Sequence, residues 1–519
     1  MIRSSQTNKK QKVLSKSIPA PVGGLNARDA LADMPETDAI ILDNWFPNPS
    51  SVNLRDGSDE FATGWSGWSE SILVYNGATN NKIFTAASDS IYNITAGGTV
   101  TVGDVTGLTN ARFQSVNFST AGGKFLLAVN GADKLRGYDG TNWYADGDGS
   151  HDITGVNTAN IININIFKSR VWLVEKNSTK AWYLPLNSIA GAATSFDFGS
   201  LFKLGGYLMG MVTWTVNDTN GMNDYAVFVS SQGEVAVYQG YDPAFASTFS
   251  LVGIFRIGRP IGRRFYCKDG SDVILITADG VIPLSKALLT DRSQLRVALS
   301  DKIVNLINTD VTSYSGNFGW QLLLHPIGNK LIVNVPQTEN SRQYQYVMNT
   351  ITGSWCTFGK TFTPWNAACF ELFDDNVYYG TDGAVFKCDT GSTDDGAAIM
   401  GDAKPAFSYF GRRGQQKYFT MARPIFQLDG SLTAAIDLNV DFEQRFPSSS
   451  PTVSSGSSGA TWDVAPWNTS DWGGTDNIEK DWQTVNGIGY AAALRAIVSS
   501  EIPVSWQSTD YVFQLGGIL

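Results

Sequence analysis

The stretch YAVFVSSQGEVAVY, residues 225–238, decides the fold. Two apolar runs rich in valine and aromatic residues flank Gln232 and Gly233, a pair that favours a tight turn. The stretch therefore predicts two antiparallel strands joined by a short hairpin. Units of this kind recur along the chain at a spacing that drifts between roughly 30 and 70 residues. They begin near residues 72, 124, 170, 225, 273, 331 and 377.

This recurrence predicts a mainly β fold built as an irregular β-propeller. Radial blades leave only short strand edges exposed, which suits a chain of many short hairpins. A set of stacked β-sandwiches is the alternative that the same pattern allows. The drifting period leaves the number of blades open.

Few short helices are expected, and the clearest covers residues 300–308. Ser300 stands at the N-cap position and Asp301 lies in the first turn. Ile303, Leu306 and Ile307 share one face by their i, i+3, i+4 spacing. We expect a linker helix packed between repeats.

The segment before the repeats has a different texture and defines the domain organisation. Residues 1–60 form an N-terminal arm and platform segment, in which Trp45 and Phe46 stand before a proline as large apolar anchors. The arm is either a strap on its own domain or a contact to a neighbouring subunit. Its basic tail is either solvated or held by a partner. Residues 61–400 are the propeller-like repeat domain, and residues 401–519 form a C-terminal β domain with a Ser/Gly/Trp-rich loop.

The composition is acidic and low in charge. The 519 residues carry a formal net charge of −10, and charged residues make up only 17% of the chain. A protein that grips nucleic acid is usually basic, so this function is disfavoured. An acidic surface suits plain solubility, or a passage through which nucleic acid slides without sticking.

Catalytic signatures are absent from the sequence. The chain has four cysteines without a CxxC pair and two histidines without a surrounding motif, and it lacks GxSxG and phosphate-loop patterns. We therefore expect no enzymatic activity and no cofactor. The cysteines predict free, mostly buried thiols in a protein assembled in a reducing cytoplasm, although a bridge between neighbouring cysteines stays open. Neither a signal peptide nor a membrane span is expected.

One loop has the spacing of a calcium-binding fragment. Asp146, Asp148 and Asp152 lie in DGDGSHD, where carboxylates can converge on a hard cation. The bidentate glutamate that completes such a loop is missing, so an ordinary acidic turn is the favoured interpretation.

Two basic clusters and a tryptophan-rich loop are candidate interfaces. Arg263 and Arg264 lie in an acid-free stretch, and Arg412, Arg413 and Lys417 lie in another. The clusters are solvated or paired within the chain, or they complement a neighbouring acidic subunit, with DNA contact as a weaker option. Trp467 and Trp472 belong either to an internally packed loop or to a docking surface.

Four segments resemble proteins of one family. They are residues 23–57 (GGLNARDALADMPETDAIILDNWFP…VNLRDG), 258–288 (GRPIGRRFYCKDGSDVILITADGVIPLSKAL), 344–359 (YQYVMNTITGSWCTFG) and 505–519 (SWQSTDYVFQLGGIL). Spread over most of the chain, they look like the tail nozzle, or tail hub, proteins of short-tailed bacteriophages.

The resemblance implies a β-propeller combined with platform and tip domains, and a homo-oligomer of six copies in a ring. Such a ring lies below the portal and the head–tail adaptor, conducts or seals the double-stranded DNA channel, and supports tail fibres or other appendages. It implies a structural virion protein without catalysis, located in the tail and assembled in the host cytoplasm. The alternative is a carbohydrate-binding or carbohydrate-hydrolysing β-propeller, suggested by the aromatic content of 12%.

Overall fold

The computed structural model describes residues 13–218, 221–289, 298–428, 430–447, 452–454, 477–479 and 481–518. The chain divides into two compact units. Unit 1 comprises residues 1–57, 348–363 and 390–519, and unit 2 comprises residues 58–347 and 364–389.

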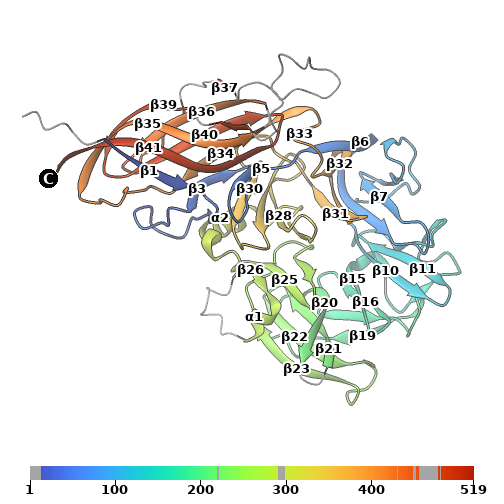
Figure 1. Cartoon of the computed structure of the whole chain (residues 1–519). Helices are drawn as coiled ribbons and strands as arrows, with labels where there is room; N and C mark the ends of the chain where they lie inside the picture. Colours follow the sequence, from blue (N-terminus) through green and yellow to red (C-terminus); the bar gives the residue numbers. More distant parts are fainter. Residues whose placement is uncertain are drawn as a thin grey trace, which may run out of the picture. The chain divides into compact units, whose positions relative to one another are not determined.

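Unit 2 consists mainly of antiparallel sheets that follow one another along the chain, among them the four-stranded sheets β10–β13 and β20–β23 and the three-stranded sheet β24–β26 (Figure 1). Each hairpin arises from a strand–turn–strand stretch such as residues 225–238, which form β21 and β22. Its strands are β6 (Ser58–Tyr75), β7 (Lys82–Ala87), β8 (Ser90–Asn93), β9 (Gly98–Thr99), β10 (Gln114–Thr120), β11 (Gly123–Val129), β12 (Arg136–Tyr138), β13 (Trp143–Ala145), β14 (Ile153–Thr154), β15 (Ile161–Phe167), β16 (Arg170–Glu175), β17 (Lys180–Tyr183), β18 (Gly191–Ala192), β19 (Thr194–Asp197), β20 (Leu208–Asp218), β21 (Gly221–Ser230), β22 (Glu234–Gly240), β23 (Phe249–Arg256), β24 (Tyr266–Asp269), β25 (Asp272–Thr277), β26 (Gly280–Pro283), β27 (Gln321–His325), β28 (Lys330–Thr338), β29 (Arg342–Asn349), β31 (Cys369–Phe373) and β32 (Asn376–Cys388). Its helices are η1 (Thr158–Asn160), α1 (Leu284–Leu289), η3 (Asp301–Ile303) and α2 (Val304–Tyr314).

The first strand of each sheet lies against the next sheet, and the series closes on itself. β10 contacts β15, β15 contacts β20, β20 contacts the β24–β26 sheet, β24 contacts β27, β27 contacts β31, and β31 and β10 both contact β6. Seven sheets among the described residues therefore surround one axis. This arrangement is a β-propeller, and it confirms the prediction of a mainly β fold with propeller blades.

Apolar cores lie between neighbouring blades. One such core centres on Trp172, which is 1% exposed and contacts Phe228 and Phe249 of the next blade. Similar clusters join β10–β12 to the β6–β8 blade and β20–β22 to the β24–β26 blade. Burial of these side chains at roughly 25 cal/mol per Å² holds each blade to its neighbour.

Unit 1 is a sandwich of two sheets. One sheet has the order β38-β35-β41-β5-β4, with β1 paired to β41 and β39 paired to β35. The other joins β2, β3, β30, β33, β34, β40, β36 and β37. The strands are β1 (Val13–Pro19), β2 (Gly24–Leu25), β3 (Asp38–Asp43), β4 (Trp45–Pro47), β5 (Val52–Leu54), β30 (Trp355–Phe358), β33 (Thr393–Asp394), β34 (Ala397–Pro405), β35 (Gln415–Leu428), β36 (Ser431–Val440), β37 (Thr452–Ser454), β38 (Asn477–Glu479), β39 (Gln483–Gly489), β40 (Ala492–Ser500) and β41 (Val504–Ile518).

Both ends of the chain contribute strands to this sandwich. β1 runs antiparallel to β41 from Val13 opposite Gln514 to Pro19 opposite Ser508, and Figure 1 shows the two strands side by side. Phe419, Leu494 and Phe513 fill the core between the sheets. The N-terminal segment is thus part of the unit's architecture.

The boundaries of the propeller differ from those predicted. The sequence places residues 61–400 in one repeat domain, whereas residues 348–363 and 390–400 belong to unit 1. The cause is strand pairing over long sequence separation, since β30 pairs with β3 and β34 pairs with β3 and β40.

The predicted helix at 300–308 exists and extends six residues further than predicted, with a 3₁₀ first turn. η3 begins at Asp301, and α2 continues to Tyr314. Ser300 makes no capping hydrogen bond, because its hydroxyl accepts from the backbone N–H of Val281 at 3.0 Å. Ile303 and Ile307 are buried as predicted.

Two further expectations concern cysteines and membrane spans. All four cysteines have free thiols, and three of them are buried. In the parts of the chain that the structure describes, no helix is long and apolar enough to cross a bilayer.

Candidate functional site

Two cavities lie among the described residues of the propeller. The larger has a volume of about 600 Å³ and is bordered by segments that lead into the innermost strands β10, β20 and β24. The smaller, about 240 Å³, lies between β10, β24, β27 and β31. Arg263 lines both cavities, so they are neighbours.

A belt of side-chain amides connects the innermost strands around these cavities. Asn163 Nδ2 donates to Gln114 Oε1 at 2.7 Å, and Asn163 Oδ1 accepts from the backbone N–H of Met211 at 3.0 Å. Gln321 Nε2 donates to the carbonyl of Phe370 at 2.6 Å, and its Oε1 accepts from the N–H of the same residue. Because each amide both donates and accepts, the belt satisfies backbone groups where the strands converge.

Arg264 belongs to the same belt and fastens the closing blades. Its Nη2 donates to the carbonyls of Glu70 at 2.8 Å and Phe113 at 3.0 Å, and to Ser71 Oγ at 2.6 Å. Burial lowers the pKa of its guanidinium, and it stays a cation at neutral pH. The sequence singles out Arg264 as an interface candidate, and the structure makes it an internal tie between blades.

Glu371 lines the smaller cavity on β31. Burial raises the pKa of its carboxyl to about 7, opposed by the Leu372 backbone N–H and the charge of Arg264. Burial penalises a carboxylate more strongly than one distant cation compensates.

The larger cavity is lined by cations. Arg112, Lys176, Arg259 and Arg263 contribute to its wall, and its described lining contains neither aspartate nor glutamate. Arg112 is held by Glu70 at 3.0 Å and by Glu339. Arg263 donates to the carbonyl of Asn130 at 3.1 Å, and Lys176 donates to the carbonyl of Gly131 at 3.2 Å.

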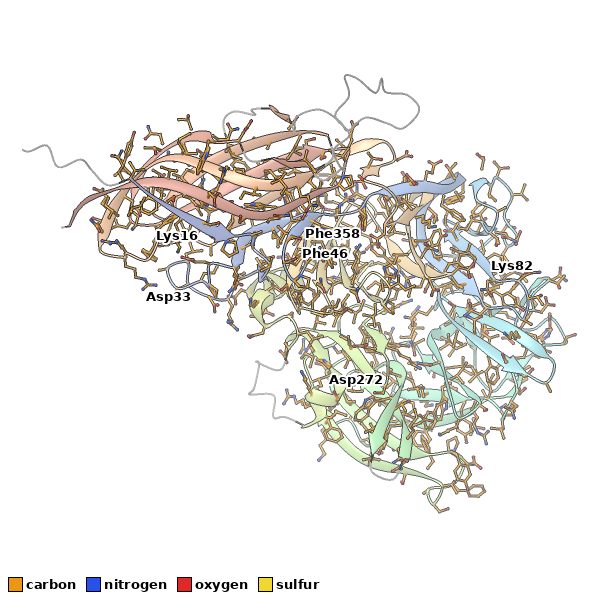
Figure 2. The ribbon with its side chains drawn as sticks, in the orientation of Figure 1. Lys16, Asp33, Phe46, Lys82, Asp272 and Phe358 are labelled. Atoms are coloured by element: carbon orange, nitrogen blue, oxygen red, sulfur yellow. The ribbon has the colours of Figure 1, made fainter. Side chains whose placement is uncertain are left out.

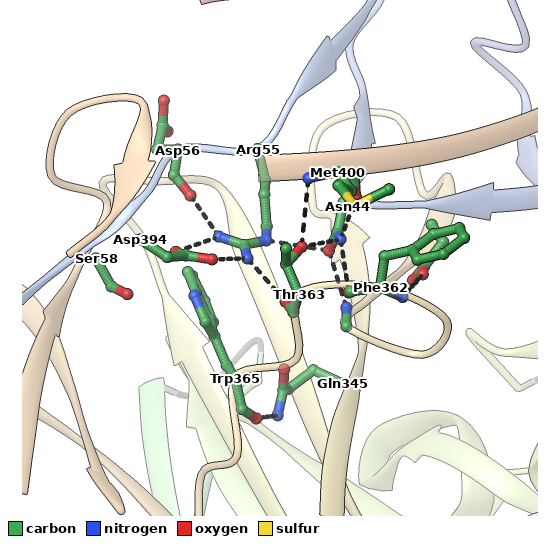
Figure 3. Close-up of polar contacts among 12 residues, drawn as sticks. Asn44, Arg55, Asp56, Ser58, Gln345, Phe362, Thr363, Trp365, Asp394 and Met400 are labelled. Carbon is green, nitrogen blue, oxygen red and sulfur yellow. Dashed lines mark hydrogen bonds and ion pairs between the residues drawn. The ribbon is translucent and has the colours of Figure 1, made fainter. Parts of the chain in front are cut away.

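The N-terminal segment is locked into unit 1 by a network around Asn44 and Arg55 (Figure 3). Asn44 has a left-handed backbone (φ 59°), which asparagine tolerates better than most residues. Its Nδ2 donates to the carbonyl of Met400 at 2.7 Å and to Thr363 Oγ1 at 2.9 Å. Its Oδ1 accepts from Arg55 Nε at 3.0 Å, and the Arg55 guanidinium forms a bidentate ion pair with Asp394.

Asp43 ties the same segment to the turn after β30. Its carboxylate accepts from Thr357 Oγ1 at 2.8 Å and from the backbone N–H groups of Lys360 at 3.0 Å and Thr361 at 2.7 Å. Burial nevertheless raises the pKa of this carboxyl above its usual value, because the hydrogen bonds only partly offset desolvation.

The predicted anchors Trp45 and Phe46 lie inside unit 1. Trp45 is completely buried and lies 6.2 Å from Phe426 and 6.0 Å from Trp506 between ring centroids. Phe46 meets Phe358 edge to face, with 6.5 Å between ring centroids; both residues are labelled in Figure 2. They pin the segment to its own chain, and Trp45 leaves no surface for a partner.

The second basic cluster is divided between surface and interior. Arg412 and Arg413 are exposed, and Arg413 pairs with Asp33 at 2.7 Å. Lys417 is buried, and its Nζ donates to the carbonyls of Arg412, Gln415 and Tyr490 at 2.7 to 2.9 Å. Lys417 is therefore a structural cation. Trp467 and Trp472 lie outside the described residues.

The acidic loop at 146–152 directs its carboxylates to separate backbone groups. Asp146 accepts from the N–H of Ile153, Asp148 from those of Ser150 and His151, and Asp152 from that of Gly149. No cluster of three metal-ligating residues occurs among the described residues. The carboxylates stabilise a turn, in keeping with the favoured interpretation of the sequence.

Several important residues escaped prediction. One feature of the sequence indicates the amide belt: Asn163 and Asn165 alternate with isoleucines in the strand IININIF. Asn44 and Arg55 had none, since their partners Thr363 and Asp394 are more than 300 residues away.

Comparisons with known proteins bear on the fold alone. No family model matches the chain. No curated protein matches it either. Among solved structures, BBS1N in complex with ARL6DN is 12% identical over 68% of this chain and 99% of its own, with a TM-score of 0.40. The β-propeller domain of Cps50 (Swd1) from Myceliophteria thermophila is 12% identical over 64% of this chain and 98% of its own, with a TM-score of 0.37. YCF48 from Cyanidioschyzon merolae is 10% identical over 66% of this chain and 97% of its own, with a TM-score of 0.34.

Proposed function

We propose that this chain is the subunit of a ring-shaped tail nozzle, or tail hub, of a short-tailed bacteriophage. In this role it is a structural virion protein that extends the DNA channel below the portal and adaptor and seals or conducts the genome. The resemblance of four sequence segments suggests the family. A propeller unit joined to a second β unit fits the architecture that the resemblance implies.

One observation carries the proposal: three of the four resembling segments converge in unit 1. In the first segment, Asp43 accepts a hydrogen bond from the hydroxyl of Thr357, and the Asn44 side chain accepts one from the backbone N–H of Gly359; both donors lie in the segment at 344–359. Trp506, from the last segment, contacts Trp45 of the first. Residues that are far apart in sequence, yet carry one resemblance, thus form a single buried framework.

A surface for a neighbouring copy is available on the propeller. β23 is the outermost strand of its sheet and pairs only with β22 among the described residues. Leu251, Val252 and Ile254 on this strand are 39%, 51% and 40% exposed. An edge strand with apolar side chains on both faces readily pairs with another chain, and isolated proteins usually protect such edges.

The net charge of −10 fits the proposed conducting role. Acidic side chains around a channel repel the phosphate backbone, so a duplex passes without binding. The proposal also includes binding to an adaptor, binding to tail fibres, and assembly in the host cytoplasm. Only the sequence resemblance supports these three points.

Electron microscopy of the purified full chain, alone and with its adaptor, tests the proposal. We expect ring-shaped particles with six-fold symmetry and a central channel. Particles that stay monomeric in both samples would overturn it.

The edge strand supplies a matched pair of variants. Val252→Lys adds a charge to the exposed edge of β23 and should abolish rings while the monomer stays folded, because a desolvated lysine opposes strand pairing. Val102→Lys alters an apolar residue that is 77% exposed outside this strand and serves as the control. Rings that form equally with both variants would exclude β23 as the contact.

A further inference from the structure

We infer that the larger cavity of the propeller, hereafter the basic cavity, binds a small phosphate-bearing anion such as inorganic phosphate, pyrophosphate or a phosphate ester. This inference stands apart from the tail function, because it rests on the lining of one cavity within unit 2. The volume of about 600 Å³ lies in the range of small-molecule sites.

The first argument is charge balance. Four cations line the basic cavity, and only Arg112 is paired with carboxylates. Lys176 and Arg263 donate to backbone carbonyls, and the exposed side chain of Arg259 forms no hydrogen bond or ion pair with the described residues. The carboxyl end of α2, whose residues Val311 and Thr312 also border the cavity, opposes these charges by only about half an elementary charge.

The second argument is that the cations act on one another. Burial lowers the pKa of the Arg263 guanidinium, and the neighbouring charges of Arg112 and Arg264 lower it further. Arg112 and Arg263 are half-buried, whereas Lys176 and Arg259 are exposed to solvent. Burying an unpaired charge is costly, so a bound anion of two or more charges would relieve the repulsion on Arg263 and offset its desolvation.

The third argument concerns the identity of the anion. Guanidinium groups bind phosphate through paired N–H donors, and Arg259 and Arg263 come from one short segment of the wall. Hydroxyl groups of Tyr207, Ser231 and Ser315 also border the cavity. A phosphate group offers more acceptor oxygens than a carboxylate, so it can engage cations and hydroxyls together. The cavity is too small for a nucleic-acid duplex.

Calorimetric titration of the full chain with phosphate, pyrophosphate and citrate, at constant ionic strength, tests this assignment. We expect pyrophosphate to bind more tightly than citrate. Arg259→Ala and Lys176→Ala should each weaken pyrophosphate binding about tenfold or more, the value of one lost charged hydrogen bond. Lys268→Ala removes an exposed charge from β24, outside the cavity, and should leave the affinity unchanged.

Three results would overturn the inference. These are no heat with phosphate or pyrophosphate, equal weakening by Lys268→Ala and Arg259→Ala, and citrate binding as tightly as pyrophosphate. A further titration with a short single-stranded oligonucleotide separates the two sources of phosphate. Tighter binding of the oligonucleotide, with the same dependence on Arg259, would reject a small-molecule ligand.

Discussion

Unit 1 and the centre of unit 2 treat buried charge in opposite ways. In unit 1, Arg55 pairs with Asp394, Arg495 pairs with Asp402, and Lys417 is surrounded by three carbonyls. In unit 2, cations line a cavity that contains no described carboxylate. The difference indicates that these buried charges fix the backbone in unit 1, whereas Lys176, Arg259 and Arg263 of unit 2 border an open volume.

The largest effect is expected from breaking a closed pair in unit 1. Arg495 and Asp402 are 4% and 1% exposed in their side chains and are joined by two hydrogen bonds. Arg495→Ala should lower the free energy of unfolding by about 3–5 kcal/mol, because it leaves a buried carboxylate without its partner. Urea denaturation followed by tryptophan fluorescence measures the change.

The control for this prediction removes both charges. The double variant Arg495→Met, Asp402→Leu should recover most of the lost stability, since a buried pair is roughly balanced against apolar residues of similar size. A single variant that costs less than about 1 kcal/mol would contradict a structural role for this pair.

The contrast between the units also explains what the sequence could predict. Strand–turn–strand units such as 225–238 were identified because alternation and turn chemistry are local, and β21 and β22 lie where expected. The partners of those strands are not local. Residues 348–363 left the predicted propeller because β30 pairs with β3, more than 300 residues earlier.

The sequence identified the basic clusters, but it did not predict the environment of each side chain in them. The sequence of an acid-free stretch does not indicate whether its arginines contact a partner, a cavity or a backbone carbonyl. Arg263 faces the cavities, Arg413 is exposed, and Lys417 is buried. Only the fold distinguishes these environments, because burial depends on which distant strands cover each residue.

The second prediction concerns the carboxyl group of Glu371 in unit 2, whose pKa is raised by burial. The pKa of Glu371 is raised from 4.5 to about 7, so folding favours its protonated form. Its contribution to stability therefore falls as the pH rises from 4.5 to 7, and the full penalty, up to about 3 kcal/mol, applies above pH 7. Glu371→Gln should be more stable than the parent at pH 8 and equal to it below pH 4.5. Denaturation midpoints across this range measure the difference, and a constant offset would contradict the prediction.

The third prediction tests whether the stability effect of an ion pair in unit 1 depends on its burial. Arg413 and Asp33 form an exposed pair in unit 1, with side chains 64% and 70% exposed. Arg413→Ala should change the thermal midpoint only marginally, because solvent screens such pairs. A loss comparable to that of Arg495→Ala would mean that unit 1 depends on its charges wherever they lie.

The last prediction concerns the sign of an effect. Arg259 is exposed at the wall of the basic cavity and has no carboxylate partner among the described residues. Arg259→Ala in phosphate-free buffer should leave the free energy of unfolding within about 0.5 kcal/mol of the parent, because the side chain is exposed and forms no hydrogen bond or ion pair with the described residues. In phosphate buffer the parent should gain stability and the variant should not, since an anion that binds only the folded state stabilises that state. Differential scanning calorimetry in the two buffers compares these cases. A variant that is destabilised in both buffers would mean that Arg259 is a structural residue, and the contrast between the two units would not hold at this position.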